Sequence, residues 1–185
     1  MSNPLTDLAQ ALERAHIPYM VIGGQAVLVY GEPRLTRDID VTLGLEPVQL
    51  PLVLGVVQEM DLRVLVGDPA AFVEKTWVLP TLHESSGLRV DFIFSWTPYE
   101  SQAIERAHTV TIGGVPVRFA ASEDVIIHKM LAGRPRDLED VRTILRKQTV
   151  DVAYIRDWLP RFADVAGQDI LETFEQLYRE VQDGL

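Results

Sequence analysis

The sequence predicts an α+β fold, with a mixed sheet and flanking helices followed by a bundle of helices. Strand and helix patterns alternate through the first 121 residues, whereas only helical periodicity continues over residues 122–185. A Gly-Gly pair, Gly23-Gly24, comes directly before a short helix, and an Asp-Ile-Asp strand follows. We therefore expect an α/β core over residues 1–121, with the helical region of residues 122–185 packed on it.

Caps, prolines and glycines mark the helix boundaries. Asn3 can cap a helix that has Pro4 at its first position and ends before Pro18. Thr97 and Glu100 form a capping box with Pro98 between them. The predicted helices cover residues 4–15, 25–30, 47–57, 69–75, 98–108, 123–132, 137–147, 152–162 and 170–182.

Strands are predicted where apolar and β-branched residues run between turn residues. Hairpins are expected across residues 84–87 and around Gly113-Gly114. The predicted strands cover residues 19–22, 38–43, 63–66, 78–82, 88–94, 109–112 and 115–119.

Composition excludes several classes of protein. The chain has no cysteine, so it has no disulfide, thiol nucleophile or cysteine-ligated zinc. Its net charge of −10 argues against a broad nucleic-acid surface, although Arg34 and Arg37 leave a local basic patch open. The amino-terminal residues lack the apolar core of a signal peptide, and the longest apolar stretch, residues 48–57, is too short to cross a bilayer. We expect a cytoplasmic protein with no membrane contact.

The segment from Gly23 to Asp40 carries the main chemical signal. Glycines that open a helix expose backbone N–H groups at the positive end of the helix dipole, which suits phosphate. Asp38 and Asp40 are two residues apart on a predicted strand, so their side chains share one face. Neighbouring carboxylates repel each other unless a cation lies between them. An exposed edge strand with a solvated acidic face is the alternative.

A third acid, Asp91, lies inside the apolar strand of residues 88–94. An acid is costly to bury there unless it is paired or binds a cation. If this strand lies beside that of Asp38, three carboxylates converge into an oxygen ligand set suited to Mg²⁺. The alternative is that Asp91 pairs with Arg89 or Arg63.

The order Gly23-Gly24, Asp38-Ile39-Asp40 and then Asp91 resembles the signature of the nucleotidyltransferase superfamily of the DNA polymerase β type. The surrounding residues Tyr30-Gly31, Arg34 and Thr36 are similar to the AbiEii-like branch, which includes toxins of bacterial toxin–antitoxin and phage-defence systems. The resemblance spans about residues 18–145 and implies a nucleotidyltransferase-type mixed sheet.

The resemblance also implies a mechanism. Asp38, Asp40 and Asp91 would bind Mg²⁺ (or Mn²⁺) as the metal ligands and serve as catalytic residues of an NTP-dependent reaction that releases pyrophosphate. Gly23 and Gly24 would bind the phosphates of the NTP. Arg34 and Thr36 would lie in the loop over those phosphates, with Arg34 neutralising charge.

Later motifs resemble the same branch, namely His128-Lys129-Met130 and the turn from Arg134 to Asp140. The resemblance implies that Lys129 contacts the triphosphate or orients the acceptor, and that an acid of the turn, Asp137 or Asp140, joins the catalytic residues. Asp137 and Asp140 share a helix face, because they are three residues apart. The alternatives are a solvent-facing lysine, and for Asp137 a helix cap or dipole partner.

Two functions compete. The first is a metal-dependent nucleotidyltransferase that moves an NMP to RNA such as a tRNA end, to a protein hydroxyl or to a small molecule. The AbiEii-like resemblance adds a toxin role with a cognate antitoxin as partner. The second is a catalytically inert module that binds nucleotide or a protein partner. The presence of all three carboxylates and both glycines counts against the second.

Overall fold

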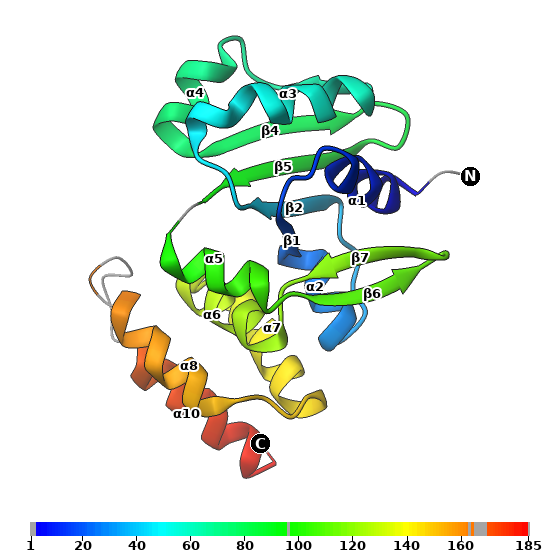
Figure 1. The fold of residues 1–185 in the computed structure, drawn as a ribbon. Coiled ribbons are helices and arrows are strands. Elements are labelled where there is room, and N and C mark those ends of the chain that lie inside the picture. Colours follow the sequence, from blue (N-terminus) through cyan, green and yellow to red (C-terminus); the bar gives the residue numbers. More distant parts are fainter. Residues whose placement is uncertain (1–2, 96, 163, 165–169, 185) are drawn as a thin grey trace. The chain divides into compact units, whose positions relative to one another are not determined.

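The computed structural model describes residues 3–95, 97–162, 164 and 170–184 (Figure 1). The chain forms two compact units. The sheet unit comprises residues 1–25 and 35–120, and the helical unit comprises residues 26–34 and 121–185. The α+β fold expected from the sequence is confirmed.

The sheet unit contains one seven-stranded mixed sheet, which joins all seven strands that the sequence predicts. Its strand order is β3-β4-β5-β2-β1-β7-β6, with β1 parallel to β7, β2 parallel to β5, and every other neighbouring pair antiparallel. The strands are β1 (Tyr19–Ile22), β2 (Asp38–Leu43), β3 (Leu62–Val64), β4 (Val78–His83), β5 (Leu88–Phe94), β6 (His108–Ile112) and β7 (Val115–Phe119). Both predicted hairpins are present.

Side-chain caps start α1 and α5 where the sequence predicts. Asn3 Oδ1 accepts a hydrogen bond from Leu5 N at 3.0 Å, and the Thr97 side chain accepts one from Glu100 N. The helices are α1 (Pro4–Arg14), a 3₁₀ turn η1 (Pro47–Gln49), α3 (Leu50–Glu59), α4 (Pro69–Thr76) and α5 (Pro98–Glu105). α5 is shorter than predicted because His108 pairs with Phe119 in the β6–β7 hairpin.

The helical unit contains α6 (Ser122–Ala132), α7 (Pro135–Lys147), α8 (Val152–Trp158), a 3₁₀ turn η2 (Leu159–Phe162) and α10 (Ile170–Gln182). Residues 26–34, which include the later turns of α2 (Gly23–Tyr30), also belong to it. Gln148 Nε2 donates to Tyr30 O at 3.0 Å, and Lys147 Nζ donates to Gly31 O at 3.2 Å. These bonds join α7 to a segment more than one hundred residues earlier in the chain.

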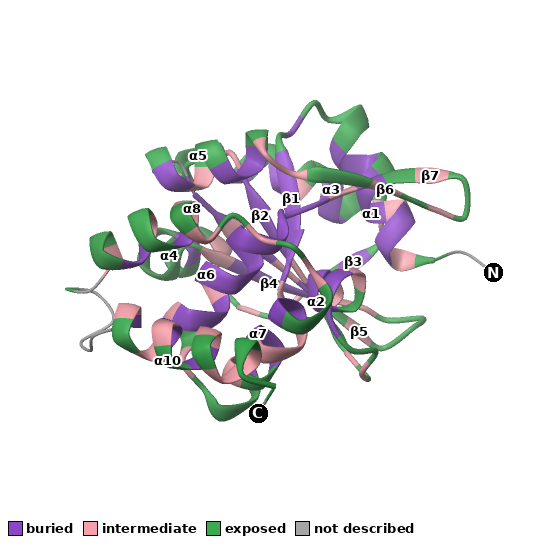
Figure 2. Ribbon diagram, turned by 90° about the horizontal axis from the view of Figure 1, so that it is seen from below, coloured by how far each residue is buried: buried purple, intermediate pink, exposed green. Residues whose placement is uncertain are grey.

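Burial follows the expected pattern within each unit. Figure 2 shows purple, buried ribbon along the central strands and on parts of the helices. All four residues of β1 are buried, and β2 is buried except at Asp38 and Asp40. These two acids are therefore the polar interruption of a central strand. No helix in the described ranges combines the length and apolar character that crossing a bilayer requires.

Gly31 packs closely against α7. A Cβ added at Gly31 would lie 2.7 Å from Thr143 Oγ1, and this hydroxyl donates to Asp140 O at 2.9 Å. We expect Gly31→Ala to lower the free energy of unfolding by about 1–3 kcal/mol, because the added methyl overpacks this contact. Urea unfolding followed by circular dichroism measures it.

The matched control is Gly55→Ala in the exposed middle of α3, where an added Cβ meets nothing within 4 Å. That substitution should raise the free energy of unfolding by about 0.5–1 kcal/mol, since glycine is a poor helix former. Equal effects of the two substitutions would show that Gly31 has room for a side chain.

Candidate functional site

An acidic face forms where β2 and β5 run side by side. The two strands are parallel, with Asp38 in register with Arg89 and Asp40 in register with Asp91. Because residues in register point to the same side of a sheet and side chains alternate along each strand, all four charged side chains share one face. The expected neighbourhood of the two strands is confirmed. The alternative of an exposed edge strand is wrong, since β2 is paired on both sides.

Gly23 brings the start of α2 against this face. Asp40 is in register with Ile22, the last residue of β1, so its side chain lies where the chain turns into the helix. Gly23 has a φ of +62°, and a Cβ added there would lie 2.0 Å from Asp40 Oδ2. Only glycine fits, both for its backbone and for the space. Gly24, which is buried, continues the first turn.

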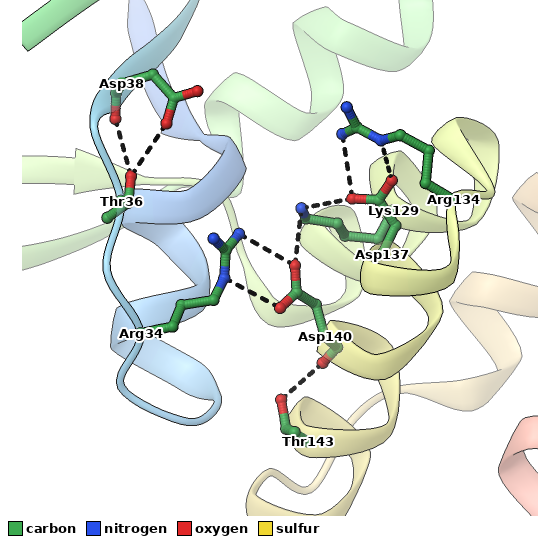
Figure 3. Close-up of polar contacts among 8 residues, drawn as sticks. All are labelled: Arg34, Thr36, Asp38, Lys129, Arg134, Asp137, Asp140 and Thr143. Atoms are coloured by element: carbon green, nitrogen blue, oxygen red, sulfur yellow. Dashed lines mark hydrogen bonds and ion pairs between the residues drawn. The ribbon is translucent and has the colours of Figure 1, made fainter.

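The beginning of β2 is held by two polar side chains. Thr36 Oγ1 lies 3.1 Å from both the backbone oxygen and the Oδ1 atom of Asp38 (Figure 3). Gln25 Nε2 donates to the same backbone oxygen at 3.3 Å. Thr36, which the resemblance assigns to a phosphate loop, therefore orients the Asp38 carboxylate in this structure.

Asp91 is paired with Arg89. Arg89 Nε donates to Asp91 Oδ1 at 2.7 Å, whereas Arg63 pairs with Glu84. The hydrogen bond to Asp91 raises the pKa of Arg89. Burial opposes this rise, and the negative charges of Asp91, Asp40 and Asp38 add to it. Of the two pairings of Asp91 that the sequence left open, the structure thus shows the one with Arg89.

The donor set fits a hard divalent cation in its chemistry. Three carboxylates lie on adjacent strands and on one face, and the absence of a Cβ at Gly23 lets the Asp40 carboxylate lie directly against the start of α2. In the described part of the chain, however, no three acidic or histidine side chains are arranged to hold a metal ion. Asp91 would have to turn from Arg89 to join such a site.

The helical unit holds a second cluster, around Lys129 of α6. Lys129 Nζ lies 2.8 Å from Asp137 Oδ1 and 2.9 Å from Asp140 Oδ2, both on α7 (Figure 3). The lysine side chain is only 8% exposed. The solvent-facing alternative for Lys129 is therefore wrong. The shared helix face of the two acids, expected from their spacing, serves to bind this one ammonium group.

Two arginines complete the cluster. Arg34 Nη2 donates to Asp140 Oδ2 at 3.2 Å, and its Nε lies 3.1 Å from Oδ1. Arg134 Nε donates to Asp137 Oδ2 at 2.5 Å. Sequence reasoning did not assign Arg134 to the site, although its spacing of three residues from Asp137 was a usable signal.

Asp137 is buried but ionised. Burial alone would raise the pKa of Asp137, but hydrogen bonds from Arg134 and Lys129, together with their charges, hold it below its usual value. Asp137 lies in the first turn of α7 and is not its cap, because the residue at the N-cap is Arg134. A dipole contribution remains, since an acid in the first turn is favourable.

Tyr30 precedes this cluster in the chain and is buried. Burial raises the pKa of Tyr30 to about 12, and the charges of Glu123 and Asp124 on α6 add to the effect. The phenol therefore stays neutral at physiological pH and offers no base.

The site residues predicted from the sequence fall into two groups. Within the sheet unit the structure assembles Gly23, Gly24, Thr36, Asp38, Asp40 and Asp91. Within the helical unit it assembles Arg34, Lys129, Asp137 and Asp140.

The sequence matches a family of nucleotidyltransferases. The match covers residues 3–183, and the family is described as nucleotidyltransferase of unknown function (DUF6036). No curated protein matches the chain.

Solved structures share the fold at low identity. The lincosamide antibiotic adenylyltransferase LnuA, with lincomycin bound, has a TM-score of 0.55 at 15% identity and covers 78% of this chain and 96% of its own. The antibiotic-resistance factor ANT(2'')-Ia has a TM-score of 0.54 at 14% identity, covering 97% of this chain and 90% of its own. The nucleotidyltransferase toxin MenT4 of Mycobacterium tuberculosis H37Rv has a TM-score of 0.53 at 16% identity, covering 86% of this chain and 63% of its own.

The contact between Gly23 and Asp40 generates a prediction. Gly23→Ala adds a methyl against Asp40 Oδ2 and places a non-glycine residue at positive φ. The positive φ costs about 1–2 kcal/mol, and the overpacking adds about 1–3 kcal/mol. Gly87→Ala is the control, because Gly87 has a φ of +69° with nothing near its added Cβ. In thermal unfolding, Gly87→Ala should show the cost of the positive φ alone. Equal costs would mean that Asp40 moves away freely.

Removal of the buried ammonium group should be strongly destabilising. Lys129→Ala leaves Asp137 and Asp140 without their shared cation, and we expect a loss of about 3–5 kcal/mol in the free energy of unfolding. Arg146→Ala removes a cation from the same helical unit, where its pair with Glu139 is exposed, and should cost about 0.5 kcal/mol or less. Chemical denaturation of both variants tests this. An unchanged free energy of unfolding in Lys129→Ala would contradict the buried cluster.

The Asp137 carboxylate predicts a pH dependence. Its folded-state pKa lies below the unfolded value, so its contribution is complete above about pH 4 and is lost as the pH falls through the folded value. Asp137→Asn should therefore cost about 3 kcal/mol at pH 7 and progressively less toward pH 2. Denaturation curves at a series of pH values measure the difference. A cost independent of pH would assign the effect to packing.

Proposed function

The chain belongs to the nucleotidyltransferase family whose match covers residues 3–183, and on that premise we propose that it transfers an NMP from an NTP to an acceptor hydroxyl and releases pyrophosphate. One observation assigns this reaction to particular residues. Asp38, Asp40 and Asp91 share one sheet face, directly beside the glycine that opens α2.

In this proposal each residue of the sheet unit has a task. The backbone N–H groups at Gly23 and Gly24 bind phosphate oxygens at the start of α2. Thr36 fixes the rotamer of Asp38 through its hydroxyl. Asp38, Asp40 and Asp91 would hold Mg²⁺ (or Mn²⁺), which when bound neutralises phosphate charge and stabilises the attacking and leaving oxygens. Asp91 helps to activate the acceptor hydroxyl.

The cluster of the helical unit supplies positive charge. Arg34, Lys129 and Arg134 face two carboxylates, Asp137 and Asp140, so the cluster keeps one net positive charge. We propose that Lys129 and Arg34 stabilise the charge that develops on the triphosphate. Asp137 and Asp140 hold the lysine in position, because an ammonium group with two fixed partners cannot change rotamer without losing both.

The acceptor defines the biological role. LnuA and ANT(2'')-Ia are an antibiotic adenylyltransferase and an antibiotic-resistance factor, whereas MenT4 is a toxin. A toxin role, with a cognate antitoxin encoded nearby, agrees with the AbiEii-like motifs. The reaction would take place in the cytoplasm, where NTPs are available. Incubation with each of four α-labelled NTPs and with total RNA, total protein or small hydroxyl compounds identifies nucleotide and acceptor together.

Metal and nucleotide should stabilise the folded protein by mass action. At one hundred times the dissociation constant, Mg²⁺ or Mn²⁺ with NTP should raise the melting temperature by about 5–10 °C. Asp38→Asn combined with Asp40→Asn should abolish this shift. It should leave the metal-free protein as stable or slightly more stable, since mutual repulsion is relieved. A double variant that keeps the full shift would locate the ligands elsewhere.

A further inference from the structure

Arg89 is the cation that lies beside the acidic side chains of β2 and β5. It is in register with Asp38, two residues before Asp91 on the same strand, and its Nε donates to Asp91 Oδ1 at 2.7 Å. Three carboxylates and one guanidinium thus share the part of the face that β2 and β5 form. Their formal charges sum to −2, because Arg89 cancels one of the three negative charges, whereas a divalent cation would cancel two.

We propose that Arg89 is the internal counter-ion of the metal site. Arg89 binds Asp91 in the metal-free protein and competes with the divalent cation for this carboxylate. The inference rests on the proposed function, because the competing cation is the one assigned to Asp38, Asp40 and Asp91. It adds a positioning residue that acts through Asp91 and sets the metal affinity.

The burial of the two partners supports an exchange. The Asp91 side chain is 17% exposed and fixed within the sheet, whereas the Arg89 side chain is 52% exposed. An ion pair with one solvated partner is worth about 0–1 kcal/mol. The guanidinium can therefore leave at little cost, while the carboxylate keeps its place.

The carboxylate geometry supports competition. While Asp91 faces Arg89, no three acidic or histidine side chains of the described chain are arranged to hold a metal ion. Exchange of partners at Asp91 is the smallest change that would complete the three-carboxylate set, because backbone register already places Asp91 beside Asp40.

Arg89→Gln provides the test, with Arg63→Gln as a closely matched control. Arg63 also lies on a strand of the sheet, is similarly exposed and forms an ion pair, but its partner is Glu84. The probe is Mn²⁺ alone, measured by calorimetry and by electron paramagnetic resonance. Removal of a positive charge near a divalent ion should tighten Mn²⁺ binding on the order of 10-fold. Arg63→Gln should change it less than about 2-fold, since exposed charges at a distance are screened.

Stability without metal gives a second, independent readout. In the presence of a chelator, Arg89→Gln should lower the melting temperature by no more than about 4 °C, and Mn²⁺ should remove the difference. In an Asp91→Asn background the same substitution should have little further effect, because its partner is already gone. Arg89→Lys keeps the positive charge and should have a Mn²⁺ affinity close to that of the wild type. This variant controls for a general folding defect caused by substitution at position 89.

The outcomes separate this inference from the proposed function. Tighter Mn²⁺ binding in Arg89→Gln, with Arg63→Gln unchanged, supports competition, even if the wild type binds Mn²⁺ too weakly to measure. Unchanged or weaker binding in Arg89→Gln, when the wild type binds Mn²⁺ and the Asp38→Asn, Asp40→Asn variant does not, overturns the inference and leaves the metal site standing. Absence of binding in both the wild type and Arg89→Gln overturns both.

Discussion

The close approach of the Asp40 carboxylate to Gly23 is the constraint on which the sheet unit depends. Asp40 is in register with Ile22 on one side and with Asp91 on the other, so it links the turn after β1 to the acidic face. A shift of one residue in either pairing would turn Asp40 into the apolar face, where Ile39 and Val41 are fully buried. The same register therefore keeps the apolar residues of β2 in the core and Asp40 on the acidic face.

Much of this arrangement was predictable from local sequence patterns. The alternation around Asp38 and Asp40 gave β2 its bounds, and the apolar run around Asp91 gave β5. Caps such as Asn3 and Thr97 gave the helix starts. Each of these signals acts over a few residues, and for that reason the strands, the helices and the shared face of Asp38 and Asp40 could be inferred without knowledge of the packing. That Asp91 joins them depends on the pairing of β2 with β5.

The features that could not be predicted depend on contacts across the chain. The spacing of Asp137 and Asp140 shows a common face, but only packing of α6 against α7 buries Lys129 between them. Likewise, Arg89 is a candidate partner for Asp91 by sequence, but the choice between Arg89 and Arg63 depends on the pairing of β3 with β4, which brings Arg63 to Glu84. The seven-strand size of the sheet also requires the parallel contact of β1 with β7, formed by strands far apart in sequence.

The long-range closure of the helical unit has a consequence for synthesis on the ribosome. Arg34 and Asp140 are 106 residues apart, and Gly31 and Lys147 are 116 residues apart. Because the chain emerges from its amino terminus, every segment of the sheet unit has been made before α7 exists. The backbone acceptors of residues 26–34 therefore stay solvated until α7 has been made. Loop closure over such distances is slow, so the nascent protein would acquire its strands and acidic face early and complete its helical unit only after α7 has been made.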